Sequence, residues 1–261
     1  MRKRLAAPKH IEERYTRLLL SVFDFVHRAY LSFLEPRLTD VARQDAFFPH
    51  STELKLLFAT LKVALRTRVI KVAEQVAQAI DEESAKVIGD LIGIDARSLG
   101  ITHLVDGFRE ENLRLVTAAT QDFADEVQDV FESAGVNGLR VEELRKKLQE
   151  RVDVSRSRAE LIARDQVLKL NGQINQTRQQ KAGITQYTWS TSLDERVREP
   201  KPGKLGPDHA SLEGQVCDWN NPPVVDTKTG RRAHPGQDFQ CRCISIPVVP
   251  ELAGFNATED D

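Results

Sequence analysis

The chain has 261 residues, enough to bury a hydrophobic core but more than the roughly 100 to 200 residues of an average single domain, so we expect two domains. The 37 lysine and arginine residues nearly balance the 39 acidic ones, and the net charge of -2 excludes a protein dominated by polybasic attraction to nucleic acid or membranes. The longest apolar stretch, residues 18–25, is far shorter than the roughly 20 apolar residues of a membrane-spanning helix. Residues 1–4 are basic but no signal-peptide core follows them, so we expect a cytoplasmic protein.

The first half of the sequence predicts long helices and almost no strand. Residues 15–34 form a first predicted helix, which Pro36 ends. Between residues 54 and 80, apolar side chains recur every three or four positions and predict a second, long helix. A third helix is expected over residues 104–131.

Two shorter helices are predicted next. Apolar residues at helical spacing indicate one helix over residues 141–152. Ser157 and Glu160 then form a capping box, which predicts the start of a new helix that ends at Gly183 with a left-handed C-cap. We therefore divide the chain into a helical N-terminal region, residues 1–152, and a C-terminal domain, residues 153–250.

The pattern changes after Gly183. Apolar and small polar residues alternate over residues 187–191, which predicts a strand. Residues 199–236 contain six of the eleven prolines and predict a long loop region, and a last strand is expected over residues 241–249. Residues 251–261 are expected to form a flexible acidic tail. The predicted fold class is α+β: a long-helix N-terminal region and a small α+β domain whose loop-rich segment a metal ion could stabilise.

Side chains of the zinc-ligand type gather in the C-terminal quarter. A structural zinc ion needs four cysteine or histidine ligands, and it would stabilise a segment with little hydrophobic core. The candidate zinc ligands are His209, His234, Cys241 and Cys243. If the two cysteines lie in a strand, however, their thiols point to opposite faces unless a turn brings both inward. The alternative is that one cysteine packs in the core while the other pairs with Cys217 or stays reduced.

The same region allows an enzymatic alternative. Asp194, His209 and His234, with the cysteines, could bind a metal ion that activates water, as in a metal-dependent hydrolase or nuclease. The sequence contains no nucleophile elbow, P-loop, HExxH or dinucleotide-binding motif. Arg196 and Arg198 could contact nucleic-acid phosphates, although ion pairs with Asp194 or a solvated surface explain them equally well.

The order of motifs in residues 157–249 is informative. It runs through Ile162-Ala163-Arg164, Trp189, Asp194-Glu195-Arg196-Val197-Arg198, His209, Leu212-Glu213-Gly214, His234-Pro235-Gly236 and Cys241-Arg242-Cys243. This order resembles the Mu F-like minor head proteins of tailed phages, also called the phage head-morphogenesis family. Two features depart from that family: Asp165-Gln166 replaces Thr-Glu, and residues 199–207 form a Pro/Gly insert. The resemblance implies a structural motif made of Arg164, Trp189, Asp194, Arg196, Arg198, Gly214 and Pro235.

The resemblance implies a non-enzymatic minor capsid protein that acts with the portal in procapsid assembly and in DNA packaging or ejection. It implies three partners, namely the portal protein, the major capsid or scaffold protein, and phage DNA, and it implies no membrane. The expected location is the head or neck of the virion, and the host cytoplasm during assembly. No cofactor follows from the resemblance, so zinc remains the one metal that the residues themselves suggest.

Overall fold

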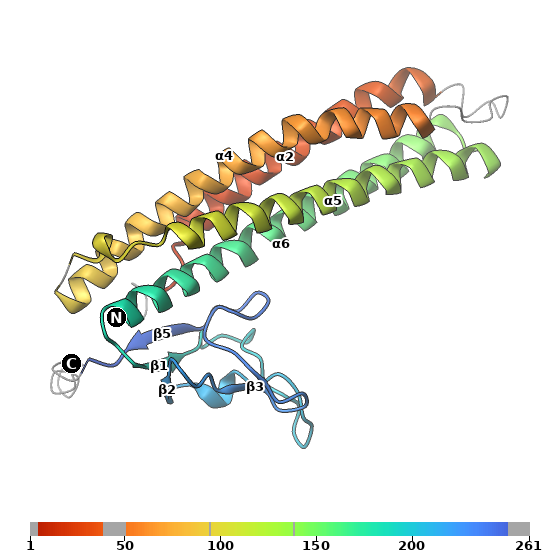
Figure 1. Ribbon diagram of the computed structural model, residues 1–261. Helices are drawn as coiled ribbons and strands as arrows, with labels where there is room; N and C mark the ends of the chain where they lie inside the picture. Colours follow the sequence, from red (N-terminus) through yellow and green to blue (C-terminus); the bar gives the residue numbers. More distant parts are fainter. Residues whose placement is uncertain (1–4, 39–50, 94, 138, 250–261) are drawn as a thin grey trace. The chain divides into compact units, whose positions relative to one another are not determined.

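A computed structural model describes residues 5–38, 51–93, 95–137 and 139–249, and it has the predicted α+β class, with long helices before a small sheet region (Figure 1). The chain forms two compact units. The first, here called the helical unit, contains residues 13–75 and 107–164. The second, here called the sheet unit, contains the chain up to residue 12, residues 76–106 and the chain from residue 165 onward. The predicted acidic tail, residues 251–261, lies outside the described residues.

The described residues contain four long helices: α2 (Lys9–Leu34), α4 (Ser51–Ile92), α5 (Thr102–Asn137) and α6 (Val141–Lys181). The first three confirm the predicted helices, but each is longer than the sequence pattern indicated. Pro36 lies in a short 3-10 helix, η1 (Glu35–Arg37), directly after α2, as expected for a residue that ends an α-helix. A second 3-10 helix, η2 (Ala96–Leu99), separates α4 from α5.

The predicted break between residues 152 and 157 is wrong, because α6 runs through it as one helix. The Ser157 hydroxyl donates to the carbonyl oxygen of Asp153 at 3.1 Å, a bond within the helix, and does not cap a new one. No glycine or proline interrupts residues 141–171, and the buried stripe continues from Val152 to Ala159. Residue 152, the predicted domain boundary, therefore lies inside α6. The predicted C-cap is confirmed: Gly183 has a φ of 80°, and the Ile184 amide donates to the Gln179 carbonyl at 2.9 Å.

In the helical unit, segments of all four helices enclose one core (Figure 1). Hydrogen bonds and ion pairs join α2 to α5, α2 to α6, α5 to α6 and α4 to α5. The apolar stripe predicted on α4 faces this core, with Leu54, Leu61, Leu65 and Val69 all buried. The largest fully buried side chains here are Tyr15, Phe23, Tyr30, Phe123 and Phe131.

A histidine lies inside this core. The imidazole of His27 is 3% exposed, its Nε2 lies 3.0 Å from the hydroxyl oxygen of Ser155, and its ring lies 4.5 Å from that of Phe123. Burial removes water from the charged form and lowers the pKa of His27 from 6.5 to about 4, although the nearby carboxylate of Asp24 acts in the opposite direction. His27 is therefore neutral at pH 7.

This burial predicts an acid-sensitive fold. Between pH 6.5 and about 4, the unfolded chain takes up a proton at residue 27 while the folded protein does not, so the free energy of unfolding falls as pH decreases through this range. The loss is on the order of 3 kcal/mol by pH 4. Chemical denaturation at several pH values should show a flatter profile for His27→Gln than for the wild type. His103→Gln, a substitution at an exposed position, should keep the wild-type slope, and an equal slope in H27Q and wild type would contradict the assignment.

The sheet unit is built around three short antiparallel strands in the order β2-β1-β5. The central strand β1 (Gln186–Ser190) confirms the predicted alternating segment, and it lies between β2 (Val216–Asp218) and β5 (Ile244–Pro247) (Figure 1). A separate two-stranded sheet pairs β3 (Val224–Asp226) with β4 (Arg231–Arg232), and the 3-10 helix η3 (Ala210–Leu212) precedes β2. The last strand is shorter than predicted, because Gln240 has a positive φ of 53° and a turn ends at Cys241.

The C-terminal half of α6 anchors this unit. The guanidinium group of Arg178 is buried, donates to the carbonyl oxygens of Ala96 and Asp81, and pairs with the Asp81 carboxylate. The Gln179 amide donates to the Ser245 carbonyl at 3.0 Å and thereby holds β5. Among the helices described, none is both long enough and apolar enough to cross a bilayer.

Candidate metal centre

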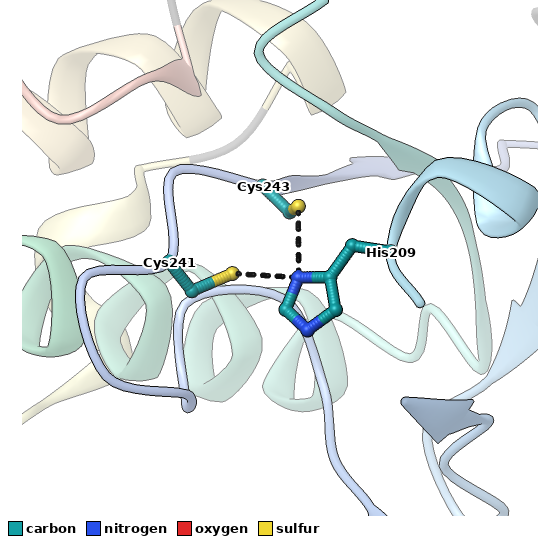
Figure 2. A group of neighbouring side chains, drawn as sticks. All are labelled: His209, Cys241 and Cys243. Atoms are coloured by element: carbon teal, nitrogen blue, oxygen red, sulfur yellow. Dashed lines mark hydrogen bonds between the residues drawn. The ribbon is translucent and has the colours of Figure 1, made fainter. Parts of the chain in front are cut away.

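Three side chains of the zinc-ligand type meet inside the sheet unit (Figure 2). The Nδ1 atom of His209 lies 3.6 Å from the Sγ atom of Cys241 and 3.6 Å from that of Cys243. All three side chains are buried, with exposed fractions of 2%, 2% and 7%. Their potential ligand atoms all lie within 4.8 Å of one another.

The two cysteines face the same way because they lie in a loop. The Cys241 amide donates to the Asp238 carbonyl at 3.2 Å and closes a turn in which Gln240 has a positive φ. The Gln240 amide points out of this turn and donates to the buried carboxylate of Asp165 on α6 at 2.7 Å. Strand β5 begins only at Ile244, so the objection that a strand would separate the two thiols does not apply.

His209 is oriented by a carboxylate on its other side. Its Nε2 atom lies 3.2 Å from the Oδ2 atom of Asp238, and that carboxylate also accepts hydrogen bonds from Arg198 at 3.3 Å and Arg231 at 2.7 Å. An Nε2–H that donates to Asp238 leaves Nδ1 as an unprotonated acceptor facing the thiols. The ring of Trp189 packs on the imidazole in a T-shaped arrangement, with 5.7 Å between the ring centroids.

The two thiols are coupled to each other by a hydrogen bond between their side chains. The hydrogen bond from Cys243 is the largest cause that lowers the pKa of Cys241, to about 4, against the opposing effect of burial. The pKa of Cys243 is raised, first by its bond to Cys241 and then by burial. Burial alone would raise the pKa of Asp238, but the hydrogen bond from Arg231 and the charge of Arg198 bring it below its ordinary value.

His234, the fourth predicted ligand, lies outside this cluster. Its Nδ1 atom forms a 2.9 Å hydrogen bond with the Tyr187 hydroxyl, and its ring packs on Trp219. Burial lowers its pKa, which favours the neutral imidazole. Cys217 is also buried apart from the cluster, its thiol contacts the Gln215 carbonyl, and all three cysteines are reduced.

The other predicted residues occupy separate positions. Asp194 is exposed and pairs with Arg242 at 2.7 Å, so it joins the segment after β1 to the cysteine loop. Arg196 is exposed, whereas Arg198 is partly buried and holds both Asp238 and the Phe239 carbonyl. The remaining motif residues are Arg164, exposed on α6 in the helical unit; Trp189, fully buried; Gly214, in a turn at φ 75°; and Pro235, in a loop against α6.

The loop that contains Pro235 touches α6 backbone to backbone. A Cβ atom on Gly172 would lie 3.0 Å from the Pro235 carbonyl oxygen, and one on Gly236 would lie 3.2 Å from the Gly172 Cα atom. Gly236 also has a φ of 81°, which side-chain-bearing residues rarely adopt. Both positions therefore require glycine for this loop to approach the helix.

This contact predicts that one added methyl group at residue 236 lowers the free energy of unfolding substantially. Gly236→Ala should destabilise the chain by about 1–3 kcal/mol more than Gly230→Ala, because a Cβ at residue 236 meets helix backbone that cannot move aside. Gly230 is the matched control: its φ is 71°, but a Cβ there would meet nothing within 4 Å. Thermal or urea denaturation measures the difference, and equal stabilities of the two variants would argue against the close approach.

Sequence reasoning missed three residues that organise the centre: Asp165, Asp238 and Arg231. Asp165 was noted only as a departure from the family pattern, yet it holds the cysteine loop and pairs with Lys169 at 2.6 Å. Asp238 lies two residues before the positive-φ position, and its role depends on partners that are distant in the sequence. An acidic residue three positions before a cysteine pair was the available signal.

Comparison with known protein families matches the C-terminal part of the chain. Residues 125–246 match the family described as Phage Mu protein F like protein. This part of the chain is similar to that family. The match confirms the resemblance of the C-terminal part, and it begins earlier than residue 157, within α5.

An uncharacterized protein from Haemophilus influenzae is 38% identical to the chain over 160 residues. These residues make up 61% of the chain and 33% of that relative, so the chain spans about a third of the relative's length. No solved structure matches the chain.

Proposed function

We propose that this chain is a minor component of a tailed-phage head that acts with the portal during procapsid assembly and in DNA packaging or ejection. The observation that carries this proposal is the match of residues 125–246 to a phage head-morphogenesis family. The matched region contains α6, the metal-centre candidates and the core of the sheet unit. The proposed location is the virion, with the host cytoplasm as the site of assembly.

The helical unit offers a surface for a protein partner. Leu56 and Val63 lie two turns apart on α4, and they are 67% and 74% exposed. Large apolar side chains at this spacing on one helix face are suited to binding in an apolar groove of another protein. The portal is the proposed partner for this face, and the major capsid or scaffold protein is the proposed partner for other surfaces.

The residues of the enzymatic alternative do not share one site. Asp194 pairs with Arg242, His234 bonds to Tyr187, and His209 faces the two cysteines. The cavity that Cys241 and Cys243 line has a volume of about 10 Å³, the room that one water molecule needs. Because Arg198 is engaged by Asp238, a contact with phage DNA would rest on Arg196 and its exposed neighbours.

Quantitative mass spectrometry of purified heads from the source phage tests the proposal. The chain should occur at a fixed low ratio to the portal protein in procapsids. The double variant L56E/V63E should reduce this ratio several-fold while far-UV circular dichroism stays unchanged, because charge prevents the apolar face from binding its groove. Leu205→Glu is the control for adding an acidic side chain elsewhere: it adds one negative charge, against two in the double variant, at a residue 68% exposed in the sheet unit. Absence of the chain from both procapsids and mature heads would refute the proposal.

A further inference from the structure

Two buried thiols converge on one nitrogen atom of His209 and are also hydrogen-bonded to each other. The unprotonated Nδ1 atom of His209 has a single lone pair and accepts a hydrogen bond from only one S–H group. Both sulfur atoms nevertheless lie at the same distance from it, 3.6 Å, and both are buried. A group at the centre of the three atoms would explain why two thiols converge on one nitrogen.

The distances are those of a zinc site. Zinc binds thiolate sulfur at about 2.3 Å and imidazole nitrogen at about 2.0–2.1 Å in a tetrahedron, so the sulfur and nitrogen ligands should lie about 3.5–3.6 Å apart. Both observed Nδ1–Sγ distances are 3.6 Å. Thiolate together with imidazole is also the donor set that favours zinc over magnesium or calcium.

From this geometry we propose that His209, Cys241 and Cys243 bind one zinc ion through Nδ1 and the two Sγ atoms. Both cysteines bind as thiolates, and the charge of the ion balances the two thiolates, so the buried site is neutral. Asp238 is a positioning residue, because its bond to Nε2 of His209 directs Nδ1 at the metal. Arg198 and Arg231 hold that carboxylate in place.

The fourth position of the tetrahedron takes a water molecule or a partner's side chain. Among the described residues, no further histidine, cysteine or carboxylate belongs to the group. The adjoining cavity of about 10 Å³ has no room for an organic substrate. The role of the ion is therefore structural: it joins the loop that contains the cysteines to the segment that contains His209.

Metal analysis of the full chain, purified under reducing conditions, tests this site. The wild type should contain about one zinc ion per chain, and Co²⁺ in place of zinc should give thiolate-to-cobalt charge-transfer bands and the intense visible bands of four-coordinate cobalt. C241S, C243S and H209Q should each lose most of the zinc. D238N should keep the stoichiometry but bind zinc about 10–100-fold more weakly.

Two control variants separate the site from the rest of the unit. C217S removes a buried thiol, and H234Q removes a buried imidazole, at positions outside the cluster, so both should retain zinc. If a ligand variant does not fold, the wild type alone decides: a chelator should lower its melting temperature, and added zinc should restore it. A reduced wild type that neither contains nor takes up zinc would overturn the proposal. Loss of zinc in folded H234Q would overturn the ligand set.

Discussion

The buried contact between one imidazole and two thiols is the constraint on which the sheet unit depends. The strands of the main sheet have five, three and four residues, and strands this short do not stabilise a domain by themselves. Most of the chain between β1 and β5 is loop, turn or short 3-10 helix. His209 lies in that long connection and the cysteines lie at its end, so their contact closes it onto the core of Trp189 and its neighbours.

The second constraint is the continuous helix α6, whose polar side chains and glycine contact the loops of the sheet unit. Asp165 holds the turn before Cys241, Gly172 admits the loop of Pro235 and Gly236, and Arg178 reaches Ala96 and Asp81. Asp165 and Gly172 are seven residues apart, close to two helical turns, so they lie on the same side of the helix, whereas Arg178 lies about 120° further around it. Because α6 is not broken at residue 157, one helix connects residues 141–156 with the segment that contacts these loops.

Local sequence patterns predicted the helices and strands, but they did not predict the contacts that hold these elements together. The periodicity of residues 54–80, the alternation of residues 187–191 and the glycine at residue 183 each depend on neighbours in the chain, and each was predicted. The bond between Asp165 and Gln240 joins residues 75 positions apart, and that bond accompanies the turn that takes both cysteines out of the strand. Residue types alone predicted that His234 and His209 belong to the same site. In the structure, His234 forms a hydrogen bond with Tyr187, whereas His209 faces the thiols.

The pattern of contacts also explains why the motif order is informative. Asp194 pairs with Arg242, His209 meets the cysteines on either side of that arginine, and Gly236 packs on α6. The short segments through which the sequence resembles the Mu F-like proteins are thus largely the segments that touch one another. In a catalytic motif, the polar side chains converge on one substrate position. Here the polar side chains of the motifs pair with one another at several separate positions. Such mutual pairing maintains the loop-rich segments in one conformation, which agrees with the proposal that neighbouring proteins in a phage head recognise them.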